Sequence, residues 1–130
     1  MSGLFSDTPA VSGFAVDDIE AAKAFYGEKL GVGLTEQARG HLLTLHLTGS
    51  DGARDTIIYK KTDFQPATYT ILNFVVEDID AAVDELLAKG VVLERYDDLD
   101  QDEKGISRRG PLIAWFKDPA GNILSVLQES

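Results

Sequence analysis

The chain has 130 residues, of which 44% are apolar and 26% charged, so we expect one compact domain with little room for a separate regulatory unit. Its formal charge of −10 repels phosphate backbones and anionic lipid surfaces, which argues against a nucleic acid partner. No apolar run is long enough to span a bilayer, the first residues lack a secretory pattern, and cysteine is absent. We therefore expect a cytoplasmic protein that contacts no membrane and uses no thiol chemistry.

An internal repeat organises the chain. The stretch FAVDDIEAA, from Phe14 to Ala22, aligns without a gap with FVVEDIDAA, from Phe74 to Ala82, and six of the nine positions are identical. Such a match indicates a duplicated supersecondary unit. Each copy starts as a strand and runs into an acidic pair, whose side chains can accept hydrogen bonds from the free N–H groups at a helix start.

In the first copy, apolar residues at helical spacing predict a helix that ends at Gly31. Alternating and β-branched residues then predict three strands, with a turn through GSDGARD before the last of them. These strands are Gly33 to Gln37, His41 to Thr48, and Thr56 to Lys61.

The second copy repeats this order. The apolar stripe from Ile79 to Leu87 predicts a helix that ends at Gly90, and the predicted strands are Val91 to Tyr96, Pro111 to Lys117 and Ile123 to Gln128. The predicted fold class is therefore α+β, with two tandem βαβββ modules that form curved mixed sheets around a cleft. The modules cover about residues 8–61 and 68–128 of a single domain, 1–130, and TDFQPA joins them.

The two βαβββ units, the acid-acid-Ile-acid-Ala-Ala pattern at each helix start, and FKDPAGN at the last hairpin together resemble the vicinal oxygen chelate superfamily. This superfamily includes glyoxalase I, bleomycin-resistance proteins and extradiol dioxygenases. The resemblance covers Thr8 to Gln128. It implies the fold but does not choose the reaction, because lyases, isomerases, dioxygenases and antibiotic-sequestering binders share this frame.

The resemblance also implies where a metal would be held. Family metalloenzymes take their ligands from the first and last strands of each module, and the matching positions here are Val11, Ile58 (within one position), Ile71 and Ser125. Hydrocarbon side chains cannot coordinate a divalent ion, and a neutral serine hydroxyl is a poor ligand. We therefore expect neither the family's metal site nor another cofactor.

Other residues could rebuild a polar site. His41 and His46 point to opposite faces if they share a regular strand, so at most one faces the cleft, where His46 could join Glu94. The acidic run DDLDQDE lacks the ligand order of a calcium loop. In its continuation, KGISRRG, Arg108 or Arg109 could contact an anion, or the loop's charges could pair with one another.

The expected cleft lining is apolar with a few neutral polar groups. Asn73 and Ser125 are its polar members, and Trp115 and Tyr59 can offer flat contact area, with Thr44 and Thr56 as further polar candidates. The predicted ligand contacts are therefore Asn73, Ser125, Trp115, Tyr59, His46 and Arg108.

This lining favours the binding of a small organic molecule over catalysis. The leading hypothesis is a metal-free superfamily member that binds a small organic ligand as a homodimer, in the manner of antibiotic-sequestering proteins. The alternatives are a glyoxalase- or dioxygenase-like enzyme with a displaced metal or with acid-base groups from the 97–109 loop, and a protein-interaction role.

Overall fold

The computed structural model describes residues 3–49 and 52–129. The first half contains β1 (Ser12–Val16), α1 (Ile19–Lys23), the π-helix η1 (Ala24–Lys29), β2 (Gly33–Gln37), the 3-10 helix η2 (Ala38–Gly40), β3 (Leu42–His46), β4 (Thr48–Gly49), β5 (Gly52–Ala53) and β6 (Thr56–Lys60). The second half contains β7 (Thr70–Val75), α2 (Ile79–Ala88), β8 (Leu112–Lys117) and β9 (Ile123–Gln128). The α+β class with mixed sheets is confirmed. Ser50 and Asp51 of the predicted GSDGARD turn lie outside the described residues.

The first half builds a four-stranded sheet in the order β1-β6-β3-β2, in which β1 and β6 are parallel. Asp18 begins α1 by accepting a hydrogen bond from the Ala21 N–H at 3.2 Å, as the acidic pair predicted. The single predicted helix is instead a short α1 followed by the wider turns of η1, which include Gly27, a weak helix former. Gly31 ends the segment with a φ of +72°.

The second half builds a three-stranded sheet in the order β7-β9-β8, covered on one face by α2. The predicted strand Val91 to Tyr96 is wrong, because only Leu93 forms a bridge, to Phe116. The side chain of Gln101 explains the difference. It accepts a hydrogen bond from the Tyr96 N–H at 2.8 Å and donates to the Glu94 carbonyl at 3.0 Å, so it occupies backbone groups that strand pairing would use.

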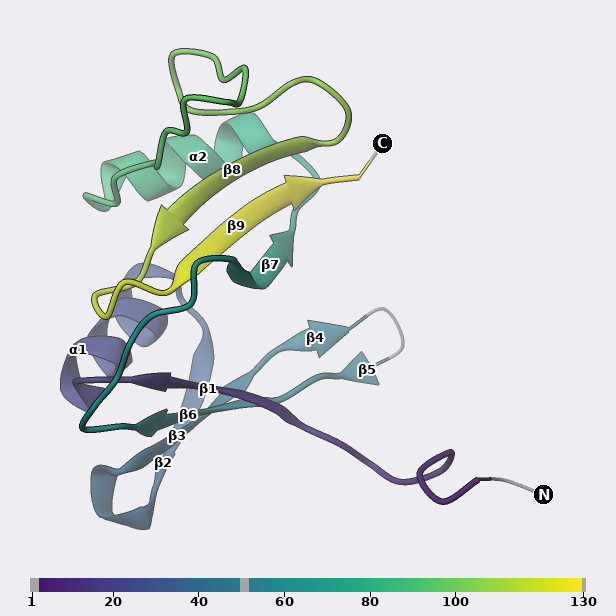
Figure 1. The fold of residues 1–130 in the computed structure, drawn as a ribbon, viewed down its shortest axis with the longest axis vertical. Helices are drawn as coiled ribbons and strands as arrows, with labels where there is room; N and C mark the ends of the chain where they lie inside the picture. Colours follow the sequence, from purple (N-terminus) through teal and green to yellow (C-terminus); the bar gives the residue numbers. More distant parts are fainter. Residues whose placement is uncertain (1–2, 50–51, 130) are drawn as a thin grey trace.

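The two halves share one hydrophobic core. Phe25 of η1 lies 6.3 Å from Phe116 of β8, measured between ring centroids, and both belong to the same buried cluster as Leu43 and Val83. In Figure 1 the second half, from the teal β7 to the yellow β9, lies above the first, and the N-terminal segment extends away from the body. None of the described helices is long and apolar enough to cross a membrane.

Polar bonds from the last hairpin tie the halves together. The hydroxyl of Tyr26, fully buried, donates to Asp118 Oδ2 at 2.7 Å. Asn122 Nδ2 donates to the same oxygen at 3.0 Å and to the Ala15 carbonyl of β1 at 2.9 Å. The Asp118 carboxylate also accepts the N–H groups of Ala120 and Asn122 at 3.0 and 2.8 Å. The FKDPAGN pattern is thus the structural link between the halves.

The Tyr26–Asp118 hydrogen bond predicts that the folded protein becomes less stable at alkaline pH. Burial, assisted by the charge and hydrogen bond of Asp118, raises the pKa of Tyr26 above its ordinary value. Tyr26 loses its proton at about pH 10 in the unfolded chain but keeps it in the folded chain. The contribution of Tyr26 to the free energy of unfolding is therefore complete below about pH 10 and is lost as pH rises above that value. Relative to Tyr26→Phe, the native protein should lose about 1.4 kcal/mol of unfolding free energy per pH unit above that point. Urea unfolding of both proteins from pH 8 to 11 measures this, and parallel pH profiles would contradict it.

Candidate functional site

Three of the predicted ligand contacts form one row across the second sheet, on the face opposite α2. Ser125 is the direct partner of Asn73 in the β7–β9 register and of Trp115 in the β8–β9 register. The Ser125 hydroxyl, fully buried, donates to Asn73 Oδ1 at 2.5 Å. Asn73 is exposed and Trp115 half-buried, so an amide and an indole are both accessible beside the serine. Their ligand role stays a prediction.

Tyr96 extends this row, and the sequence did not single it out. Its ring meets Trp115 edge to face, with centroids 5.6 Å apart and planes at 85°. Its hydroxyl is buried and has no hydrogen-bond partner within residues 3–49 and 52–129. Burial, followed by the negative charge of Glu94, raises the pKa of Tyr96, so the phenol stays protonated at neutral pH. A buried unpaired hydroxyl is uncommon, and this one belongs to the ring that packs against Trp115.

Tyr59 lies in a different place. It is on the face of β6 opposite α1, paired in register with Ala15 of β1. There it borders a cavity of about 540 Å³ between the start of β1, the start of β7 and the segment that joins the halves. Thr56 also lines this cavity; it is buried, and its hydroxyl lies 2.6 Å from that of Ser12. Thr44 donates to Gln37 at 2.7 Å.

His46 and Glu94 have separate partners. His46 Nε2 lies 2.6 Å from the Thr35 hydroxyl, and its Nδ1 lies 3.4 Å from Asp55 Oδ1. Glu94 pairs instead with Lys117 at 3.6 Å in the second half. The two side chains therefore do not contact each other in one donor set.

Arg108 fastens the 97–110 loop to α2. Its guanidinium contacts Asp80 and Asp102, each at 2.8 Å, and Lys104 contacts Asp80 and Asp84 at 3.5 and 3.0 Å. Although partial burial opposes the shift, hydrogen bonds from the Ile106 N–H and from Arg108 hold the pKa of Asp102 below its ordinary value. The opposite charges of this loop thus pair with one another and with the helix.

The residues at the expected metal positions do not fit a divalent ion. Ile58 is fully buried on the helix side, so its neighbour Tyr59 is the residue on the open face. Val11 is exposed just before β1, Ile71 lies at an irregular point of the β7–β9 pairing, and Ser125 bonds to Asn73. In the described parts of the chain, no three His, Asp or Glu side chains gather as they would around a metal.

The comparisons with known proteins agree with this fold. The family model described as the Glyoxalase/Bleomycin resistance protein/Dioxygenase superfamily matches residues 10–126. No curated protein is a significant match to the chain.

Several solved structures are similar to the whole chain. TnmS3, an antibiotic binding protein from Streptomyces sp. CB03234, is 26% identical with a TM-score of 0.63, over 95% of this chain and 98% of that one. A lactoylglutathione lyase from Agrobacterium tumefaciens is 20% identical with a TM-score of 0.63, over 94% and 93%. FosX, a fosfomycin resistance protein from Listeria monocytogenes, is 14% identical with a TM-score of 0.68, over 100% and 95%. With the fold, the repeated helix starts and the final hairpin in place, the chain belongs to the Glyoxalase/Bleomycin resistance protein/Dioxygenase superfamily.

Proposed function

We propose that the protein binds a small organic molecule without a metal ion, as antibiotic-sequestering members of its superfamily do. The row of Asn73, Ser125 and Trp115 carries this proposal, because it combines a flat apolar surface with neutral hydrogen-bonding groups. The unpartnered Tyr96 hydroxyl beside Trp115 adds one more group that a ligand can satisfy. The likeness to TnmS3, an antibiotic binding protein, supports the same class of activity.

The chemistry of the row favours binding over catalysis. Its members are an amide, a hydroxyl, an indole and a protonated phenol, none of which exchanges a proton readily near neutral pH. The charged groups Lys104, Arg108 and Asp102 of the neighbouring loop are engaged with one another and with α2. They would have to leave these partners before they could serve as acid-base groups.

We further propose that the domain, with modules at about 8–61 and 68–128, works as a homodimer whose partner chain covers the open sheet faces. Large apolar side chains stand in solvent in the single chain: Val75 of β7 is 60% exposed, and Leu4 and Phe5 of the segment before β1 are 83% and 76% exposed. Burial of such side chains is the usual driving force for association. The cytoplasmic location stays a prediction.

Binding can be tested with bleomycin and a panel of planar or cationic natural products in a thermal-unfolding assay. A compound present at 100 times its dissociation constant adds about 2.7 kcal/mol to the unfolding free energy. Trp115→Ala should weaken binding of a positive compound by about 2 kcal/mol, because it removes the aromatic surface, whereas Trp115→Phe keeps a ring and should retain most of the affinity.

Metal analysis of protein purified without chelator completes the test. We expect no stoichiometric transition metal, and no gain in the affinity of the positive compound when Ni²⁺, Zn²⁺, Mn²⁺ or Fe²⁺ is added. The proposal would be overturned by a tightly held metal ion, or by a positive compound that binds Trp115→Ala with the same affinity as the unchanged protein.

A further inference from the structure

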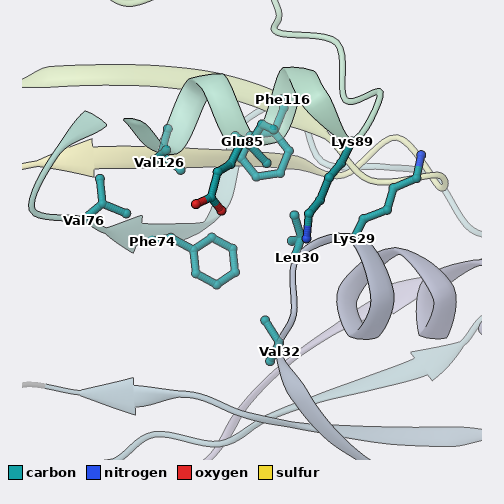
Figure 2. A pocket seen from close by; sticks show the side chains of 11 residues that line it. Lys29, Leu30, Val32, Phe74, Val76, Glu85, Lys89, Phe116 and Val126 are labelled. Carbon is teal, nitrogen blue, oxygen red and sulfur yellow. The ribbon is translucent and has the colours of Figure 1, made fainter. Parts of the chain in front are cut away.

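A separate cavity of about 210 Å³ lies on the helix side of the second sheet, where the two halves of the chain meet (Figure 2). Its walls come from three directions: α2, the sheet beneath it, and the segment that leaves η1. The apolar lining includes Leu30, Val32, Phe74, Leu86, Phe116 and Val126. Asn73, Ser125 and Trp115 point to the opposite face of the same sheet, so this cavity is independent of the site proposed above.

The size and polarity of this cavity suit a compact hydrocarbon group. An apolar cavity of about 150 Å³ accommodates benzene, so 210 Å³ accepts one substituted ring or a chain of about six carbons. Water gains few hydrogen bonds from such walls, and an apolar group that replaces it buries additional surface.

Three charged side chains stand at the mouth: Lys29 from the end of η1, and Glu85 and Lys89 from α2. Figure 2 shows the Lys89 nitrogen near Leu30 and the Glu85 carboxylate on the other side of the opening, whereas the Lys29 nitrogen points away from the cavity. Lys23, Lys61, Lys104 and Lys117 each contact a carboxylate. Within the described residues, Lys29 and Lys89 have no such partner.

We propose that this cavity binds a small apolar monocarboxylate, with the hydrocarbon part between α2 and the sheet and the carboxylate at Lys89, where the flexible Lys29 side chain can join it after a change of rotamer. Lys89 brings one ammonium group to the mouth, and a rotamer change of the exposed Lys29 side chain brings a second, in a chain of net charge −10. Glu85 limits the charge of the ligand, because it repels a second anionic group. Since Leu30 and Val32 belong to the first half and the other walls to the second, the bound molecule also holds the halves together.

The test uses hexanoate as the probe, with 1-hexanol and hexylamine as neutral and cationic analogues of similar length. A ligand of this size should bind with a dissociation constant of about 1 mM. Chemical-shift titration of the methyl groups should show saturable changes at Leu30, Val32, Val76 and Val126. Hexanoate should bind at least about threefold more tightly than 1-hexanol, and hexylamine should be the weakest.

Matched variants locate the ligand and assign the charges. Ala82 lies on the α2 side of the cavity, and Ala82→Leu fills it without a helix-breaking residue, so it should weaken hexanoate by about tenfold or more. Lys89→Met should remove most of the preference for hexanoate over 1-hexanol, and Glu85→Gln should tighten hexanoate by about threefold. Both side chains are exposed, so the fold should survive these changes.

Several results would overturn this inference. These are no methyl shifts at about 10 mM hexanoate, shifts centred on the Ser125 and Trp115 face, unchanged affinity in Ala82→Leu, or hexylamine as the tightest of the three. Trp115→Ala should leave hexanoate binding intact. This outcome separates the cavity under α2 from the row on the opposite face, so either proposal can fail alone.

Discussion

Replacement of Asp118 by alanine is expected to lower the free energy of unfolding by about 3 kcal/mol or more. The carboxylate accepts four hydrogen bonds, from Tyr26, Ala120 and twice from Asn122, and it is only 4% exposed. Without it, the buried Tyr26 hydroxyl and two backbone N–H groups lose their partner at the junction of the halves. Chemical denaturation followed by circular dichroism measures the change.

Two further variants test whether the loss of stability comes from the hydrogen bonds of Asp118 or simply from the removal of a negative charge. Asp98→Ala removes an exposed carboxylate from the 97–110 loop and should change stability by less than about 0.5 kcal/mol. Tyr26→Phe removes one of the four hydrogen bonds and should cost about 1 kcal/mol. Equal stability of Asp118→Ala and Asp98→Ala would refute the structural role of the last hairpin.

The second large effect is expected for Ser125→Glu, which places a carboxylate where the family resemblance implies one in a metal-dependent enzyme. Ser125 is fully buried, and the residues at the other expected metal positions offer no cation to balance a new negative charge. We expect a loss of about 3 kcal/mol or more at pH 8. Added Zn²⁺ or Ni²⁺ should not restore the unfolding midpoint.

Ser125→Gln is the matched control, because it has the size of glutamate without the charge. Burial should raise the pKa of the introduced carboxyl group, so its neutral form carries little penalty in acid and the penalty grows as pH rises through the pKa range. The stability gap between the Glu and Gln variants should therefore widen from pH 5 to pH 8. A constant gap would show that nearby groups already stabilise an anion there, and rescue by a metal ion would show that the introduced carboxylate completes a metal site.

Local patterns were sufficient to predict most of the fold. The acidic pair in each repeat predicted both helix starts, where Asp18 and Asp78 accept hydrogen bonds from Ala21 and Ala81. The strands Gly33–Gln37 and Ile123–Gln128 occupy the predicted positions, since alternation of side chains is a property of short segments. Prediction fails where a side chain from outside the segment bonds to its backbone, as Gln101 does at Tyr96.

The candidate site was predictable only in part, for the same reason. Asn73, Ser125 and Trp115 were each recognisable as residues of cleft-forming strands, but their direct adjacency depends on the strand order β7-β9-β8. Tyr96 was overlooked because its contact with Trp115 arises outside a regular strand. The cavity under α2 is lined by residues of both halves, which are far apart in the sequence, so local sequence patterns could not predict it.

The bonds of the last hairpin also constrain how the chain folds as it is made. Asp118 joins Tyr26 across 92 residues, and Asn122 joins Ala15 across 107. Contacts between such distant residues slow folding, and the ribosome releases the N-terminal residues first. Phe25 and Tyr26 therefore lack their neighbours from the last hairpin until nearly the whole polypeptide has been synthesised. During translation, chaperones or other nascent chains can bind this incompletely covered aromatic surface.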